Sequence, residues 1–337
     1  MFRFDPMFES VIKVRKLTEL YMVCATSPMS EGPPEEGKVP GNLRTLLAGL
    51  DTSGVQVANH NELSAIEMGS PEEALLMLQL EALLAEQTGS DDQKVMARWE
   101  TFKAASVYKW YPCKELPLWC LRARSHTVEG AAELLPRVMS MMEELEIGVG
   151  DQKQLHADLQ SKAIIDTGTK DAHGRAIIWM RLRYIDSTRS SASDIARLFT
   201  TVLLHALRDT GVQRHGFVWL ADCSRSSFMN ITPATVNAFW RTVLPNVPIC
   251  LGRVFIVNPP WFISQIMWPI VSSFLPLALR KSHVLIYGAR KELWAERLAH
   301  FDVPDSSIPT ELGGLADVDS EAYATSVIHS LHISTEE

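Results

Sequence analysis

The chain has 337 residues, of which 46% are apolar and 21% are charged. This composition is typical of a globular protein with one large domain or two modest ones, and it excludes disorder along the whole chain. The formal net charge of −8 leaves no basic excess to neutralise phosphates, so we expect no nucleic acid as the principal partner.

Residues 1–69 are predicted to form a partly disordered N-terminal extension. The sequence does not identify a protein partner for this extension. Residues 26–61 are rich in Ser, Gly, Pro, Asn and Glu, which is typical of a linker. Residues 1–23 mix acidic with basic side chains and contain no apolar core before a small-residue cleavage site, so they are not a secretory signal. Within them, residues 8–17 could form a short helix that either packs on the protein or lies on a membrane.

A small helical module is predicted over residues 70–148. Ser70 is a plausible N-cap, Pro71 occupies the first helical position and Glu73 the third. Further helices are expected over residues 92–107, from residue 115 or 117 onward, and over residues 128–145.

After Gly150 the pattern changes to alternating strands and helices, which predicts an α/β domain over residues 151–316. Strands are expected at residues 164–166, 175–184, 216–222, 254–257 and 283–287, and helices at residues 193–211, from 232 onward and at 261–275. The first two strands read as a hairpin, so the sheet should combine crossovers with an antiparallel edge pair. Residues 317–337 are expected to be a C-terminal tail.

Residues 254–279 include no formally charged side chain, and this run is longer than the roughly 20 residues that a membrane-spanning helix needs. Four prolines, at positions 259, 260, 269 and 276, argue against a spanning helix because each removes a backbone donor that hydrocarbon does not replace. We expect a buried strand that ends at Pro259-Pro260, followed by an unusually apolar helix.

Two stretches resemble the CRAL-TRIO lipid-binding family, which includes the cellular retinaldehyde-binding, α-tocopherol transfer and phosphatidylinositol transfer proteins. The first is Leu118-Trp119-Cys120-Leu121-Arg122-Ala123-Arg124, followed by Val128 and Ala131-Ala132. The second is Leu251-Gly252-Arg253-Val254-Phe255-Ile256-Val257-Asn258-Pro259-Pro260-Trp261-Phe262, followed by Phe274-Leu275 and by Ile308-Pro309-Thr310-Glu311-Leu312-Gly313-Gly314.

This resemblance implies an α/β fold of the CRAL-TRIO type, in which helices cover a mixed β-sheet floor and a small all-α module precedes the sheet. It implies an apolar gate helix over a cavity that holds one hydrophobic small molecule or phospholipid, without covalent chemistry. The protein would be cytoplasmic, would touch membranes transiently, and would carry or present its lipid between them. No cofactor other than the bound lipid is expected.

The sequence departs from the phosphatidylinositol-transfer branch of that family. That branch has a Glu and a Lys where this chain has Ile249 and His283, and hydroxyl residues where this chain has Phe217 and Trp219. Without a charged grip on an inositol phosphate, the cavity should prefer neutral or weakly polar lipids. The family's glycine after the strand's Asp is also missing, because Ser224-Arg225-Ser226 occupies that loop.

The candidate lipid-binding side chains are the apolar residues of the expected strands and of the gate helix. Phe217 and Trp219 must face the same side of their strand, and so must Val254 and Ile256. The alternative for these strand residues is simple filling of the core. The full set is Met180, Leu182, Phe217, Trp219, Phe228, Ile249, Val254, Ile256, Phe262, Ile266, Met267, Ile270, Phe274 and His283.

The patterns of metal and catalytic sites are absent from the sequence. The five cysteines show no CxxC spacing and are expected to be reduced thiols, and the ten histidines form no HxxxH or HExxH pair. Asp222, at the end of a strand, is a possible catalytic position with His205 or His215 as base, but the family resemblance makes it structural. We therefore predict no enzyme. The competing function is a protein-interaction or regulatory module whose lipid pocket is filled or vestigial.

Overall fold

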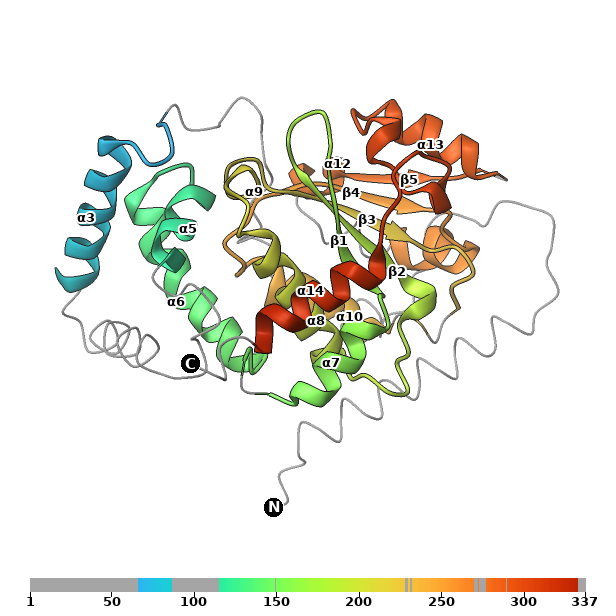
Figure 1. Cartoon of the computed structure of the whole chain (residues 1–337), viewed down its shortest axis with the longest axis horizontal. Helices are drawn as coiled ribbons and strands as arrows, with labels where there is room; N and C mark the ends of the chain where they lie inside the picture. Colours follow the sequence, from blue (N-terminus) through green and yellow to red (C-terminus); the bar gives the residue numbers. More distant parts are fainter. Residues whose placement is uncertain are drawn as a thin grey trace, which may run out of the picture.

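The protein is described here by a computed structural model that covers residues 66–86, 115–148, 150–227, 230, 232–269, 272, 277–288 and 290–332 (Figure 1). Its centre is a five-stranded sheet in the order β1-β2-β3-β4-β5. The strands are β1 (Ile164–Lys170), β2 (Ala176–Arg181), β3 (Phe217–Asp222), β4 (Leu251–Val257) and β5 (His283–Ile286). Strands β1 and β2 are antiparallel and the other pairs are parallel, which confirms the predicted edge hairpin and crossovers.

Strands β2 and β3 are buried at every position because the sheet is covered on both faces. Side chains alternate between two apolar cores, so Trp219 lies in the core under one face, while Trp179 of the neighbouring strand lies in the core under the other. The larger core contains Trp219, and most of the helices contribute side chains to it. The smaller one packs against α13 (Lys291–Ala299) and the segment that follows it.

The helices of the larger core and of the N-terminal module are α3 (Pro71–Glu86), α5 (Leu116–Ala123), α6 (Val128–Glu144), α7 (Gln152–Gln160), α8 (Ala192–Ala206), α9 (Thr210–His215), α10 (Pro233–Asn237), α12 (Leu277–Ser282) and α14 (Ser320–His332). Of these, α7, α9, α12 and α14 were not predicted from the sequence. Short 3-10 segments lie at η4 (Leu182–Tyr184), η7 (Asp305–Ser307) and η8 (Thr310–Leu312), and π-helical segments at η5 (Ala238–Val243) and η6 (Ile263–Met267).

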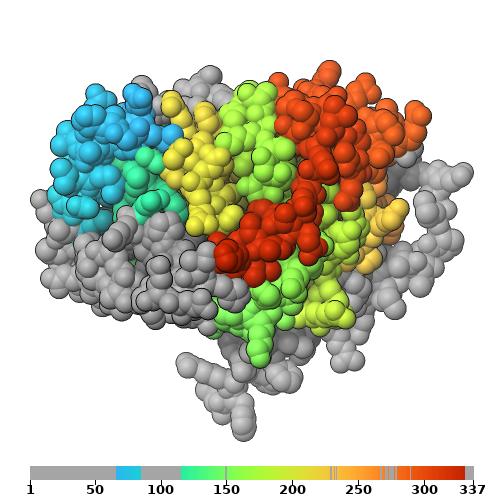
Figure 2. All heavy atoms as spheres, in the orientation of Figure 1, coloured from blue at the N-terminus to red at the C-terminus, as the bar shows by residue number. Residues whose placement is uncertain are grey.

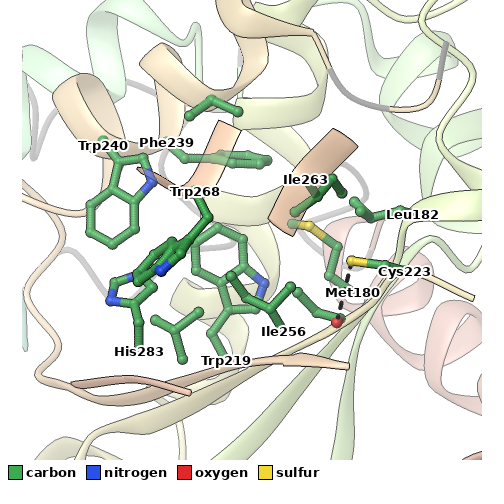
Figure 3. A pocket seen from close by; sticks show the side chains of 13 residues that line it. Met180, Leu182, Trp219, Cys223, Phe239, Trp240, Ile256, Ile263, Trp268 and His283 are labelled. Carbon is green, nitrogen blue, oxygen red and sulfur yellow. Dashed lines mark hydrogen bonds between the residues drawn. The ribbon is translucent and has the colours of Figure 1, made fainter. Parts of the chain in front are cut away.

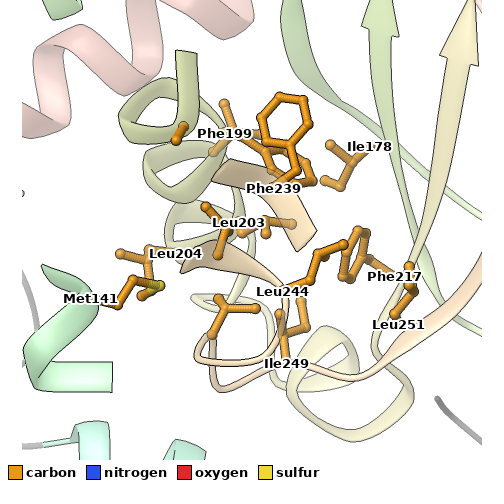
Figure 4. Packing of buried hydrophobic residues seen from close by; sticks show 14 of the residues in the cluster. Met141, Ile178, Phe199, Leu203, Leu204, Phe217, Phe239, Leu244, Ile249 and Leu251 are labelled. Atoms are coloured by element: carbon orange, nitrogen blue, oxygen red, sulfur yellow. The ribbon is translucent and has the colours of Figure 1, made fainter. Parts of the chain in front are cut away.

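The module of α3, α5 and α6 shares one core with the sheet. Figure 4 shows Met141 of α6 near Leu203 and Leu204 of α8, which in turn lie near Phe217 and the loop that carries Ile249. The apolar stripes of α6 and α8 therefore fill the space between the module and the β-sheet. This packing holds α8 against one face of the sheet.

Helix boundaries differ from the expectations at α8 and α9. Helix α8 is capped by Ser191 rather than by Ser193 or Asp194, because Asp194 completes a capping box with Ser191. It ends at Ala206 rather than at residue 211, since Asp209 caps the separate helix α9.

Two more segments differ from the sequence reading. The expected second strand ends at Arg181, and η4 turns Tyr184 outward to 44% exposure. The expected C-terminal tail contains α14, which packs on β1 and α7 with Val327 fully buried; Figure 2 shows it lying across the surface. The predicted helix at residues 92–107 and most of the N-terminal extension lie outside the described residues.

Candidate functional site

An apolar pocket of about 90 Å³ lies between the larger-core face of the sheet and the helical segments above it (Figure 3). It is lined by Met180, Leu182, Trp219, Ala221, Cys223, Val236, Phe239, Trp240, Val254, Ile256, Ile263, Trp268 and His283. None of these thirteen residues is Lys, Arg, Asp or Glu.

The pocket floor follows from the register of the parallel strands. Met180 pairs with Ala221, and Ala221 with Ile256, so one row of side chains crosses β2, β3 and β4. A second row runs from Trp219 through Val254 to His283 on β3, β4 and β5. Residues paired across neighbouring strands point to the same face, so each row is a continuous strip of the floor.

The roof comes from α10 and η5. Helix α10 is capped by Thr232, whose hydroxyl accepts a hydrogen bond from the Thr235 amide. The helix continues as the π-helical segment η5, which carries Phe239 and Trp240 into the pocket wall. The ring of Trp219 lies 5.4 Å from that of Phe239, edge to face, and 6.3 Å from that of Trp240. The floor and roof therefore meet through aromatic contacts.

His283 closes one end of the pocket as an uncharged ring. Its Nδ1 atom lies 2.6 Å from the carbonyl oxygen of Leu279, and its ring centroid lies 5.0 Å from those of Trp240 and Trp268. Burial lowers the pKa of His283 to about 4, although the hydrogen bond to Leu279 acts in the opposite direction. The imidazole is therefore neutral at pH 7, with Nδ1 as donor.

The gate segment, residues 261–269, covers the pocket next to His283. Trp261 is 53% exposed at its start, whereas Phe262 and Ile263 are buried. Ile263 and Trp268 line the pocket. This described part of the expected gate helix is helical, with the π-helical turn η6 inside it.

Six of the predicted lipid-binding residues line this pocket: Met180, Leu182, Trp219, Val254, Ile256 and His283. Three others lie elsewhere. Phe217 lies two residues before Trp219 on β3, but its ring packs on that of Phe199, with 6.4 Å between the centroids, and Ile249 belongs to the core beside Leu244 (Figure 4). Phe262 is buried, with its ring 6.4 Å from that of Trp261.

Of the remaining predicted residues, Phe228, Ile270 and Phe274 lie outside the described residues, and only the backbone is described for Ile266 and Met267. The sequence reading also missed seven lining residues: Ala221, Cys223, Val236, Phe239, Trp240, Ile263 and Trp268. Ala221 and Cys223 continue the two-residue period of Trp219, so the strand pattern contained a signal for them.

Asp222, the possible catalytic residue, is held in structural contacts. Its carboxylate lies 2.5 Å from Arg183 and accepts a 2.8 Å hydrogen bond from the amide of Ser224. Burial raises the pKa of the adjacent Cys223 thiol well above its usual range, and burial lowers the pKa of His205 to about 4. Arg225 takes the left-handed conformation, with φ of 58°, in the loop where the family has its glycine.

The described part of the chain contains no cluster of three or more His, Cys, Asp or Glu side chains that could hold a metal ion. Among the same residues, no helix has both the length and the apolar character needed to cross a bilayer.

Part of the chain is similar to a known protein family. The family model described as CRAL/TRIO domain matches residues 160–314. Among solved structures, one titled "Crystal structure of Sfh5" aligns over 67% of this chain and 84% of its own, with 13% identity and a TM-score of 0.39. A search of curated proteins gave no significant match. The matched residues contain all five strands and the pocket floor, so this part of the chain is a CRAL/TRIO domain.

Proposed function

We propose that this protein binds a single hydrophobic lipid in the pocket on the sheet, without covalent chemistry, and carries or presents it between membranes. The observation that carries the proposal is the thirteen-residue wall, which is apolar or aromatic apart from one thiol and one neutral imidazole. Transfer of apolar ligand surface into such a site contributes roughly 25 cal/mol per Å².

The size of the pocket implies that the gate segment moves when a lipid binds. Pockets for small molecules usually enclose about 300–1,000 Å³, whereas this one measures about 90 Å³. Ile263 and Trp268 are the lining residues of the gate segment, so its displacement would enlarge the pocket without disturbing the sheet. Binding and gate opening would then be coupled.

The surface around the gate supports contact with a membrane. Trp261 is 53% exposed and Leu277 is 62% exposed, and the exposed Arg280 and Lys281 end the following helix α12. Indole rings are favoured at the depth of lipid headgroups, and cations attract anionic headgroups. The proposed protein is cytoplasmic and associates with membranes transiently, and this surface would make the contact.

A second candidate is a protein-interaction or regulatory module whose pocket is filled by its own side chains. The small volume and the close contacts among Trp219, Phe239 and Trp240 favour it. In that case the pocket would serve stability, and the partner would bind elsewhere.

Mass spectrometry of an organic extract of the purified protein distinguishes the two functions. We expect lipid close to one molecule per chain. The matched variant is Ala221→Leu, which adds apolar volume to the pocket floor and should exclude the lipid without removing a contact. If the wild-type extract contains no lipid, and apolar ligands neither bind nor alter the melting temperature, the interaction module is the better explanation.

A further inference from the structure

A second cavity, of about 200 Å³, lies beside α7 and has more room than the lipid pocket of about 90 Å³. Its wall consists mainly of side chains from α7, from residues 184–190 and from α8, and none of its lining residues lines the lipid pocket. The wall includes the apolar Ile185, Ile195 and Leu198 as well as polar and charged side chains. A ligand that fits this wall has both an apolar and a polar part.

Asp158 of α7 lines this cavity, and only one of its carboxylate oxygens is hydrogen-bonded. Oδ1 accepts a 3.0 Å bond from the side-chain amide of Gln154 and a 2.6 Å bond from the hydroxyl of Ser190. Oδ2 is buried without a partner among the described residues, and the whole residue is only 8% exposed. Such an oxygen loses its water without compensation, so a donor on a ligand in the cavity would stabilise it.

The arginines on the segments around the cavity do not form an ion pair with Asp158. Arg189 lines the cavity but pairs with Asp186, and its side chain is 84% exposed. Arg197 of α8 forms its ion pairs with other acidic residues. Burial raises the pKa of Asp158, and its hydrogen bonds and the charge of Arg197 only partly offset this effect. A bound cation would supply the missing counter-charge.

The wall also indicates the class of cation. Hard metal ions such as Ca²⁺ take about six to eight oxygen ligands, whereas the described residues contain no cluster of three or more metal-binding side chains. An ionised acid would be repelled by Asp158. A primary ammonium group combines a positive charge with three donors, and an alkyl chain attached to it would contact Ile185, Ile195 and Leu198.

We propose that this cavity binds a small soluble primary amine in its ammonium form, with Asp158 as the counter-charge and the apolar side chains in contact with its alkyl chain. The site does not depend on the proposed function, because it shares no lining residue with the lipid pocket. The two sites adjoin one short segment, since Leu182 of η4 lines the lipid pocket and Tyr184 lines this cavity. Amine and lipid would therefore bind at the same time.

Isothermal titration calorimetry of the full-length protein with hexylammonium, hexanol and hexanoate tests this site, since the three ligands share one chain and differ at its end. We expect hexylammonium to bind about tenfold more tightly than either of the others, which corresponds to about 1.4 kcal/mol. Asp158→Asn should remove this preference, because asparagine keeps the oxygen that accepts from Gln154 and Ser190 but not the negative charge. Ala157→Leu, at an exposed lining position of α7, should also weaken hexylammonium binding, so the test does not depend on the stability of one variant.

Glu296→Gln is the matched control. It removes the same unit of charge from an exposed carboxylate of α13, which packs on the other face of the sheet, so the ligand preference should not change. Equal affinity of the wild-type protein for the three ligands, or an unchanged preference in folded Asp158→Asn, would overturn the inference and leave the proposed function standing. Displacement of hexylammonium by phosphatidylethanolamine vesicles, which present the same group on a membrane, would overturn the assignment to a soluble amine.

Discussion

The Arg122 guanidinium donates two hydrogen bonds of 2.7 Å to the carboxylate of Glu73, and both side chains are buried. The same carboxylate accepts a hydrogen bond from the amide of Gly69 and contacts the ring of His126, so it joins the start of α3 to the end of α5. Arg122 also donates to Gln213 of α9. Arg122, which belongs to the N-terminal stretch that resembles the family, is thus one of the links between the helical module and the α/β domain.

We expect Glu73→Ala to lower the free energy of unfolding by about 3–5 kcal/mol, because it leaves the buried Arg122 cation without a counter-charge. Chemical denaturation measures the change. Arg189→Ala is the control, since this arginine forms an ion pair with Asp186 at 84% exposure and should cost less than about 1 kcal/mol. Equal losses in the two variants would mean that the buried pair is not a structural link.

The same pair predicts a sensitivity to acid. Burial alone would raise the pKa of Glu73, but the hydrogen bonds from Arg122, Gly69 and His126 outweigh it and lower the pKa to about 2. A carboxyl whose pKa is lower in the folded state stabilises the fold above its ordinary pKa of 4.5, and this contribution disappears as the pH falls toward 2. Glu73→Gln should therefore flatten the dependence of stability on pH in this window.

The glycine at position 313, in the family-like segment 308–314, has a steric explanation. Gly313 has a φ of +90°, and a β-carbon there would lie 2.4 Å from the carbonyl oxygen of Lys291. Gly168 also has a positive φ, of +71°, but a β-carbon there would meet nothing within 4 Å. The two glycines therefore separate the cost of the backbone conformation from the cost of the clash.

We expect Gly168→Ala to destabilise the protein by about 1 kcal/mol through its backbone conformation alone. Gly313→Ala should cost about 2 kcal/mol more, because the backbone of α13 must move away from the new methyl group. Thermal and urea denaturation of both variants give the difference. Similar losses at the two positions would show that the close contact with Lys291 is relieved without strain.

The sheet was predictable from the sequence because its strands are short apolar runs bounded by turn residues, and the capped helices at Ser70 and Thr232 were predictable from their caps. The roof of the pocket was predictable only in part. The 3.6-residue period indicated that Val236, Phe239 and Val243 turn inward, and all three are buried. It did not indicate Trp240, because the π-helical segment η5 departs from that period. For Phe217 the alternation of the strand predicted the correct face of the sheet. It could not show that this residue packs in the core beside the pocket instead of lining it.

His283 should stay neutral far below the usual pH range of histidine. Its pKa is lowered by burial to about 4, so the unfolded chain takes up a proton first as the pH falls below the ordinary value of 6.5. Its contribution to stability is therefore constant above 6.5 and falls between 6.5 and 4. In His283→Gln this contribution to the pH dependence disappears. Nitrogen-15 NMR of the ring would contradict the expectation if His283 titrated near 6.5.

Variants of the gate segment and of the pocket floor should affect lipid transfer between vesicles and lipid retention in solution differently. Trp261 is exposed on the gate segment and does not line the pocket, so Trp261→Ala should weaken membrane contact and leave the pocket intact. A loss of about 1 kcal/mol in membrane affinity would slow lipid transfer between vesicles roughly fivefold. Phe262, which the sequence suggested as a lipid-binding residue, is only 4% exposed, so Phe262→Ala would report on stability instead.

Ala221→Leu tests the floor in the opposite way, because it occupies pocket volume and leaves the gate surface unchanged. It should reduce the lipid retained in solution and, with it, the amount transferred, without reducing vesicle binding by the protein.

Leu315→Ala is the control for Trp261→Ala, since it removes another exposed apolar side chain, 74% exposed, that lies away from the gate segment in the sequence. If Trp261→Ala and Leu315→Ala slow transfer equally, with thermal melts unchanged, the gate surface has no special role in membrane contact and the coupling of opening to that contact fails.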